Sequence, residues 1–292
     1  MKPFPTAVSV VMRSFNEAWA VGETIRMLQA QDFDGAIELI VIDSGSTDGS
    51  IGIIKALRPA KLIEIPLGTY VPGVVLNQGA REATHDWIVY LNADATPVGG
   101  DWLKELLKPG LASGKFGAAF SRQIPRPDCR AVFAHDYDRC FGPRRVSGNW
   151  DHFFSMVGSV THRSVLDQVP IREDLQYAED DEWTRRLVQQ GFEVIYAEKS
   201  VVMHSHNYTP QQSYKRAFGD AKAMAEAGTQ DSAAGILTGW IADSLRDAKW
   251  LLGKGKLSEL PYAAAVRLAQ RRGRRDGYLA GKPESRTAPS PK

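Results

Sequence analysis

The sequence predicts an α/β protein, in which a doubly wound, mostly parallel sheet carries helices on both faces and a helical extension follows. Two observations predict this class. Apolar runs of strand length alternate with segments of helical period, and the runs are apolar on both faces, which is typical of strands covered on each side. The 292 residues, 43% hydrophobic and 24% charged, can form one sizeable core with an appendage, and they exclude disordered and collagen-like classes.

The first third of the chain supplies this alternation. We expect strands at Ala7–Met12, Glu38–Asp43, Lys61–Ile65 and Trp87–Asn92. We expect helices between them, at Glu17–Gln31, Ser50–Leu57 and Gly73–Ala83. Each strand is thus followed by a helix, as a parallel sheet requires.

The middle of the chain has a different texture. Ser121–Gly148 is rich in Pro, Arg, Asp and aromatic residues without clear periodicity, and its length predicts a functional loop or lid rather than an ordinary connection. We then expect a strand that turns into a short helix within Phe153–Val165. A further helix is predicted at Asp180–Gln190, with Gly191 as its C′ residue, followed by a strand at Phe192–Tyr196.

The C-terminal third predicts an appended helical region. The sequence suggests three parts, residues 1–209, a helical extension at 210–280 and a disordered tail at 281–292. The extension carries an apolar stripe formed by Ile236, Trp240, Ile241, Leu245, Trp250 and Leu251. We expect this stripe to pack on the first domain. The alternative is an interfacial helix on an anionic membrane, with the basic segment RLAQRRGRRDG beside it.

Charge distribution and targeting signals limit which partners and which cellular compartment the sequence predicts. The net charge is +2, and Ala263–Lys292 holds eight Lys and Arg residues against two acids. Because these basic residues gather in one tail, the sequence does not predict nucleic-acid binding. The N-terminal apolar run is too short for a signal peptide, and Cys129 and Cys140 lack metal or redox spacing. We therefore expect a cytoplasmic protein with reduced thiols, although one disulfide stays an alternative.

Three of the predicted strands end in polar residues. These are Arg13–Glu17, Asp43–Ser50 and Asn92–Asp94, and in a doubly wound sheet such ends line one ligand crevice. No dinucleotide fingerprint or P-loop motif follows any of them, which argues against both kinds of nucleotide site. The crevice must therefore bind its ligand in another way.

Each acidic residue of these ends also has a structural explanation. We expect Asp48 to cap the following helix, and for Asn16 and Glu17 capping and ligand contact are equally supported. Asp43 ends a buried strand, where its carboxylate could accept a hydrogen bond from a base N–H.

Two further polar clusters stand later in the sequence. A helix N-terminus explains one or two of the acids in Glu179–Glu182, but four like charges in a row predict that at least one faces a site. His204 and His206 fall on one face of an extended segment and could complete a Mn²⁺ or Mg²⁺ ligand set or contact a phosphate.

Six segments in this order resemble family 2 glycosyltransferases of the GT-A fold, particularly the bacterial rhamnosyltransferase-like branch: VSVVMRSFNE, ELIVIDSGSTDGS, WIVYLNADATP, SRQIPRPD, YAEDDEWTRRLVQQGF and HSHNY. The resemblance covers about residues 7–220. It implies an inverting enzyme that moves a sugar such as rhamnose from a dTDP or UDP donor to a hydroxyl of a surface-glycan or lipid-linked acceptor. It also implies a divalent metal, Mn²⁺ or Mg²⁺, at the diphosphate.

The resemblance assigns roles to individual residues. It implies that Asp180 is the catalytic base and that Glu179 and Asp181 form a secondary acidic site. It implies a metal site formed by Asp94 with His206 or His204. The nucleotide contacts implied are Ser14, Asn16, Glu17, Asp43, Ser44, Asn77 and Asn92, and Asp43 favours uridine or thymidine as the base.

Some positions depart from the family pattern. Asn92 replaces the first aspartate of D-x-D, which removes a charge and implies weaker metal binding, and Leu76 stands where many members have arginine. The processive motif Q-x-x-R-W is absent, which favours single-sugar transfer. A catalytically weak nucleotide-sugar-binding or scaffold module is the alternative. A nucleotidyltransferase is a third hypothesis, but the chain lacks the Gly-rich N-terminal loop of that class.

Overall fold

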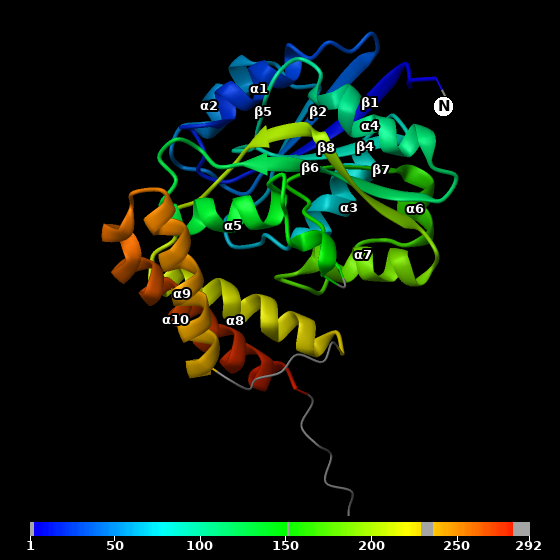
Figure 1. Cartoon of the computed structure of the whole chain (residues 1–292). Coiled ribbons are helices and arrows are strands. Elements are labelled where there is room, and N and C mark those ends of the chain that lie inside the picture. The colour runs from blue at the N-terminus through cyan, green and yellow to red at the C-terminus, as the bar shows by residue number, and fades with distance from the viewer. Residues whose placement is uncertain (1–2, 151, 229–235, 283–292) are drawn as a thin grey trace, which may run out of the picture. The chain divides into compact units, whose positions relative to one another are not determined.

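The computed structural model describes residues 3–150, 152–228 and 236–282. The chain forms two compact units, of which the first, an α/β unit, ends at His206 (Figure 1). The second, a helical unit, begins at Asn207 and also includes Gln176–Ala178. The chain therefore passes from one unit to the other just before the predicted boundary at residue 209. Most of the predicted disordered tail lies outside the described residues.

The α/β unit is built on one mixed sheet. Within the described residues it has eight strands in the order β3-β2-β1-β4-β7-β6-β8-β5. Their bounds are β1 Ala7–Ser14, β2 Ala36–Asp43, β3 Lys61–Glu64, β4 Trp87–Asn92, β5 Thr96–Pro97, β6 Phe116–Ile124, β7 Gly158–His162 and β8 Glu193–Met203. The pairs β1–β2, β1–β4, β2–β3 and β6–β8 are parallel, whereas β7 and β5 run antiparallel to their neighbours. The predicted mostly parallel sheet is confirmed.

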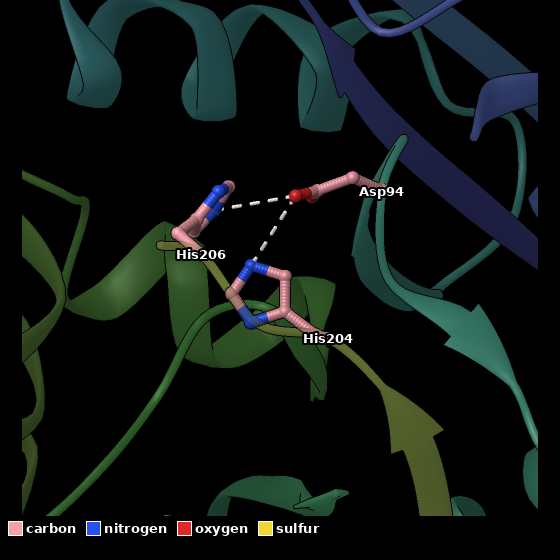
Figure 2. A group of neighbouring side chains, drawn as sticks. All are labelled: Asp94, His204 and His206. Carbon is pink, nitrogen blue, oxygen red and sulfur yellow. Dashed lines mark ion pairs between the residues drawn. The ribbon is translucent and has the colours of Figure 1, made fainter. Parts of the chain in front are cut away.

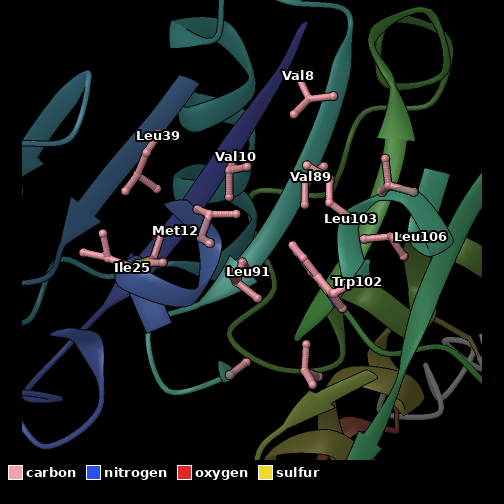
Figure 3. Close-up of a cluster of buried hydrophobic side chains, with 14 of the residues drawn as sticks. Val8, Val10, Met12, Ile25, Leu39, Val89, Leu91, Trp102, Leu103 and Leu106 are labelled. Atoms are coloured by element: carbon pink, nitrogen blue, oxygen red, sulfur yellow. The ribbon is translucent and has the colours of Figure 1, made fainter. Parts of the chain in front are cut away.

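Helices cover both faces of this sheet. They are α1 Val21–Gln29, α2 Ser50–Ala56, α3 Pro72–Glu82, α4 Trp102–Ala112, α5 Ala131–Phe141, α6 Arg163–Gln168 and α7 Glu179–Gln189. Val8, Val10 and Met12 of β1 pack into one apolar cluster with α1 and α4 (Figure 3). Val11, between them, belongs to a second cluster, with Leu76 of α3 and Trp183 of α7. Alternate residues of a strand point to opposite faces, so the strand is buried on both.

Two sequence predictions differ from the structure. Helix α1 begins at Val21 rather than Glu17, because the amide of Ala20 turns back to the carbonyl of Glu17 at 2.9 Å. The segment Ser121–Gly148 is not irregular throughout, because strand β6 continues to Ile124 and α5 spans Ala131–Phe141, and its role as a functional loop or lid stays a prediction. The buried face of α5 includes His135 and is interrupted by charged residues, which hid the helical period.

The helical unit consists of α8 Pro210–Glu226, α9 Ile236–Gly253 and α10 Leu260–Gly281. Glycines on α10 allow α8 to approach closely: a Cβ added at Gly277 would lie 2.1 Å from the carbonyl oxygen of Phe218. Asp247 of α9 forms a buried ion pair with Arg267 of α10 at 2.7 Å. Among the described residues, none of the helices combines the length and the hydropathy needed to cross a bilayer. The predicted packing of the apolar stripe on the first domain stays a prediction.

Candidate active site

The loops that follow β1 and β2 interlock at the carboxyl edge of the sheet. Asp48 accepts hydrogen bonds from the amides of Ala18 at 2.9 Å and Ser50 at 3.0 Å, next to the start of α2, but the N-cap residue of this helix is Gly49 and not Asp48 as predicted. Asn16, with a left-handed φ of 54°, accepts one from the amide of Thr47 at 2.9 Å. These hydrogen bonds therefore connect the two loops to each other at this edge of the sheet.

Asp43 stabilises the loop that follows β2. It is fully buried, and its carboxylate accepts hydrogen bonds from the amides of Gly45 at 3.1 Å and Ser46 at 2.7 Å. The hydroxyl of Ser46 donates a third, at 2.7 Å. Ser14 and Ser44 are buried beside it, and the amide of Ser44 bonds the carbonyl of Ser14 at 3.0 Å. The carboxylate thus shapes its own turn, and contact with a nucleotide base stays a prediction.

Asp94, His204 and His206 form a cluster at this edge (Figure 2). Asp94 follows β4, whereas the two histidines follow β8, and the pairing of β5 with β8 brings the two segments together. The Nε2 atoms of His204 and His206 lie 3.5 Å and 3.2 Å from Oδ2 of Asp94. The prediction that both histidines share one face at a strand end is confirmed by this arrangement.

The donor set of this cluster fits a divalent cation. One ligand atom from each of the three residues lies within 4.8 Å of the others. Asp94 is 1% exposed, and neither of its carboxylate oxygens accepts a hydrogen bond within the described chain. A buried carboxylate without donors requires a neighbouring positive charge. Carboxylate and imidazole together suit Mn²⁺ and softer divalent ions.

The hydrogen bonds of His204 are also compatible with binding a divalent cation. Its Nδ1 lies 2.9 Å from Oε1 of Gln123, and the amide of Gln123 donates through Nε2 to Ser155 at 2.7 Å. With the amide in this orientation, Oε1 of Gln123 is an acceptor for a proton on Nδ1 of His204, and the hydroxyl of Tyr137 lies 3.2 Å from the same nitrogen. A histidine that carries its proton on Nδ1 has its lone pair on Nε2, which here faces Asp94, as in metal-binding histidines that donate their other N–H to an acceptor.

Arg13 connects this edge to the acidic start of α7. Its guanidinium donates to Oδ1 of Asn92 at 2.9 Å, to the hydroxyl of Tyr70 at 3.1 Å and to Glu179 at 3.3 Å. Asn92 thus directs its amide oxygen at a cation of the protein itself. The residue that departs from D-x-D helps to hold Arg13, and Arg13 holds Glu179 next to Asp180.

The four acids of α7 have different partners. Glu179 pairs with Arg13, Asp181 with Arg185 at 2.8 Å and Glu182 with Arg186 at 2.8 Å. Asp180 accepts only from backbone amides in the described residues, those of Asp181 at 2.9 Å and Met156 at 3.4 Å. Of the four, it is therefore the carboxylate that no cationic side chain neutralises directly.

Burial and neighbouring acids shift two pKa values at this edge. Burial, with Glu179 next to it, raises the pKa of Asp180 to about 7. Burial, with Asp94 nearby, raises the pKa of Glu17 to about 8. A carboxyl that titrates near neutral pH can accept and release a proton in that range, which is the property required of a general base.

The sequence model named "Glycosyl transferase family 2" matches residues 9–169, more than half of the chain. The chain belongs to this family. It is 28% identical over 192 residues to the O-antigen chain rhamnosyltransferase RfbN of Salmonella typhimurium, and 29% identical over 193 residues to WbaN of Salmonella anatum. Each match covers 62% of this chain and 61% or 60% of the relative, so the chain spans about three fifths of their length.

Solved structures show the same fold. The mannosyltransferase PcManGT from Pyrobaculum calidifontis, in complex with GDP-Man and Mn²⁺, superposes with a TM-score of 0.62 at 19% identity, covering 94% of this chain and 86% of that one. Glucosyl-3-phosphoglycerate synthase from Mycobacterium tuberculosis, with Mn²⁺ and UDP, gives 0.54 at 19% identity, covering 79% and 83%. This family 2 chain therefore has a GT-A-like α/β fold with a helical C-terminal segment.

Arg126 is a basic residue of the site to which the sequence analysis gave no role. Its guanidinium donates to the backbone oxygen of Asp94 at 2.8 Å and to Thr96 at 3.2 Å. It also lies 4.7 Å from the ring centre of Trp19, a side chain that is 58% exposed. The segment SRQIPRPD contained a signal for this residue, because arginine is a common ligand of phosphate groups.

Asn77 is not brought into this group by any described contact. Its amide donates to the carbonyl of Ile171 at 2.7 Å and to Glu173 at 3.0 Å, and with them lines a separate pocket of about 470 Å³. These contacts join α3 to the chain before α7. The prediction that Asn77 contacts the nucleotide therefore has no support in the described contacts, and a structural role explains them.

Proposed function

We propose that this chain is an inverting glycosyltransferase that moves a sugar from a nucleoside diphosphate to an acceptor hydroxyl. The observation that carries the proposal is one chain of contacts at the sheet edge. Arg13 bonds both Asn92, two residues before the metal-fitting carboxylate of Asp94, and Glu179, the residue before the proton-accepting carboxylate of Asp180. These contacts support a diphosphate site and a base that lie close to each other, as the reaction requires.

Asp94, His204 and His206 are the residues that would hold a divalent cation, Mn²⁺ or Mg²⁺. The bound ion would supply a positive charge for the leaving diphosphate. Gln123 would keep His204 in the metal-binding tautomer. The guanidinium of Arg126, fixed against the backbone of Asp94, adds a second positive charge on this side of the site.

Asp180 would act as the base. Its carboxylate takes the proton of the acceptor hydroxyl while the hydroxyl oxygen attacks the anomeric carbon, opposite the diphosphate that leaves with the bonding electrons. The configuration at that carbon is inverted by this displacement. The raised pKa of Asp180, about 7, makes it a stronger base than an ordinary aspartate while it stays partly ionised at neutral pH.

We propose a donor with rhamnose or a similar sugar on dTDP or UDP, and an acceptor that is a surface glycan or a lipid-linked glycan. The printed names of the two Salmonella relatives support the sugar and the glycan. Asp43 would favour a pyrimidine base, with Asn16, Glu17 and Ser14 lining the nucleotide side. We place the enzyme on the cytoplasmic side, with residues 1–209 as the catalytic domain.

The experiment that tests this function measures donor binding and turnover separately. Thermal shift with UDP, dTDP, GDP and CMP, each with and without Mn²⁺ or Mg²⁺, should show metal-dependent stabilisation by one diphosphate. Asp94→Asn should remove the metal dependence, and Asp180→Asn should abolish turnover but retain donor binding. Binding without turnover in the wild-type chain, for every sugar and acceptor class tested, would favour the scaffold alternative. Absence of any nucleotide effect would refute the proposal.

A further inference from the structure

Helix α9 is polar on its inner face and apolar on its outer face. Its buried residues are Asp243, Asp247 and Leu251. Four large apolar side chains of the same helix are exposed: Leu237 at 64%, Ile241 at 45%, Leu245 at 66% and Leu252 at 68%. Their spacing of four, four and seven residues places them in one stripe along the helix. Two members of the stripe predicted from the sequence, Ile241 and Leu245, therefore face outward.

Ion pairs fix this orientation. Asp247 is fully buried and pairs with Arg267 of α10, which is itself 5% exposed, at 2.7 Å. Asp243 pairs with Arg271 of α10 at 2.7 Å and with Arg246 at 2.6 Å. A rotation of α9 that turned its leucines inward would separate buried charges from their partners, which is strongly unfavourable. The apolar stripe is thus held outward by the fold of the helical unit.

The exposed charges around the stripe are predominantly basic. Within the described parts of α9, α10 and the segment that joins them, every exposed charged residue is basic: Lys249, Lys254, Lys256, Arg272, Arg274 and Arg275. Lys249 lies within the stripe, between Leu245 and Leu252. The acids Asp243 and Asp247 are turned inward and paired. Asp276 of α10, with a side chain 41% exposed, lies 4.0 Å from Arg275, and Glu259 is half-buried. The exposed face therefore combines leucines with an excess of basic residues.

We propose that this face of α9 binds an anionic membrane surface. Leucine side chains enter the boundary between head groups and acyl chains, and the flanking lysines and arginines contact anionic head groups. A second copy of the chain is the less favoured occupant, because two such faces would bring like charges together. The inference goes beyond the proposed function and does not depend on catalysis, although a lipid-linked acceptor would lie at the same surface.

Sedimentation of the full chain with vesicles tests the proposal. We expect binding to vesicles of phosphatidylcholine mixed with phosphatidylglycerol, weak binding to phosphatidylcholine alone, and release by salt. The double variant Leu245→Ser, Leu252→Ser should lower vesicle binding by at least about 10-fold. Leu67→Ser is the matched control, because Leu67 is equally exposed, at 66%, but belongs to the α/β unit.

Three outcomes would overturn the inference. The double variant could bind anionic vesicles as well as the wild-type chain does. The wild-type chain could ignore vesicles and form a dimer, seen by light scattering, that the double variant loses. It could also ignore vesicles and unfold at lower temperature in the double variant, which would place the stripe against another part of the same chain. Donor-induced thermal shift is independent of all three, so a failure here is distinguishable from a failure of the proposed function.

Discussion

Replacing Asp180 with asparagine should stabilise the fold above neutral pH while it removes turnover. The pKa of Asp180 rises from 3.8 to about 7 because burial and Glu179 disfavour its charged form. The native state therefore binds a proton more tightly than the unfolded chain, so this group lowers the stability of the fold as pH rises from about 4 to about 7. Asp180→Asn removes that loss, because its side chain stays neutral at every pH.

The magnitude follows from the pKa. At about 1.36 kcal/mol per pKa unit, a rise from 3.8 to about 7 corresponds to at most about 4 kcal/mol at pH 8. The carboxylate is partly exposed, which reduces this to about half. The amide also loses the weak hydrogen bond from Met156, worth about 1 kcal/mol at most. A net gain of about 1–2 kcal/mol should raise Tm by about 2–8 °C.

Differential scanning calorimetry at pH 5 and pH 8 measures this effect, and a coupled assay of diphosphate release measures turnover. We expect the Tm gain at pH 8 to shrink toward zero near pH 4, and turnover to fall by about 10²–10⁴-fold. Glu182→Gln is the control, because Glu182 pairs with Arg186 and its loss should lower stability by about 1 kcal/mol. A lower Tm for Asp180→Asn at pH 8, or retained turnover, would refute the reasoning.

Three further predictions concern the metal site and the helical unit. Gln123→Leu removes a hydrogen-bond partner of Nδ1 of His204, and Mn²⁺ affinity measured by calorimetry should fall by about 10–100-fold. Asn92→Asp restores the family's D-x-D, yet Mn²⁺ affinity should stay close to that of the wild type, because the new carboxylate pairs with Arg13. Gly277→Ala should lower the unfolding free energy of the helical unit by about 1–3 kcal/mol, since its Cβ would meet the backbone of α8, and thermal unfolding followed by circular dichroism measures it.

Two of these predictions have a matched control, and the third has a result that would contradict it. Gln123→Glu retains an acceptor for the Nδ1–H and should preserve metal affinity better than the leucine variant. A strong gain of Mn²⁺ affinity in Asn92→Asp would show that its carboxylate reaches the cation. For the helical unit, Gly253→Ala adds a methyl group where no atom lies within 4 Å, so it should be neutral or slightly stabilising. Equal effects at Gly277 and Gly253 would contradict the close-packing argument.

Much of the fold was predictable because a strand that is buried on both faces appears in the sequence as a continuous run of apolar residues. The runs at β1, β2, β3 and β4 are mostly apolar where their neighbours cover them, although Ser9, Ser14 and Asp43 are buried polar residues. Helix α5 was missed for the opposite reason, since its inner face includes His135 among charged residues. The edge strand β5, two residues long, has no pattern that periodicity could detect.

Site residues that stand at strand ends could be predicted from the sequence. Those whose position depends on how two strands pair could not. His204 and His206 follow one strand, so a period of two placed them together. The role of Gln123 depends on the pairing of β6 with β8, in which Gln123 lies opposite Val202, and no local pattern gives that register. For Asn77, the sequence could not show which way the side chain points from α3. A side chain on the right segment can still face another neighbour.

The separation of the ligand residues along the chain determines when during folding a metal can bind. Asp94 precedes β5 and His204 follows β8, so the ligand set forms only after this edge of the sheet has paired. Contacts between residues so far apart in sequence form late, because closing the intervening loop is entropically unfavourable. A cation held by this set would bind the paired edge and stabilise it against unfolding. Metal uptake would therefore report that β5 and β8 have paired.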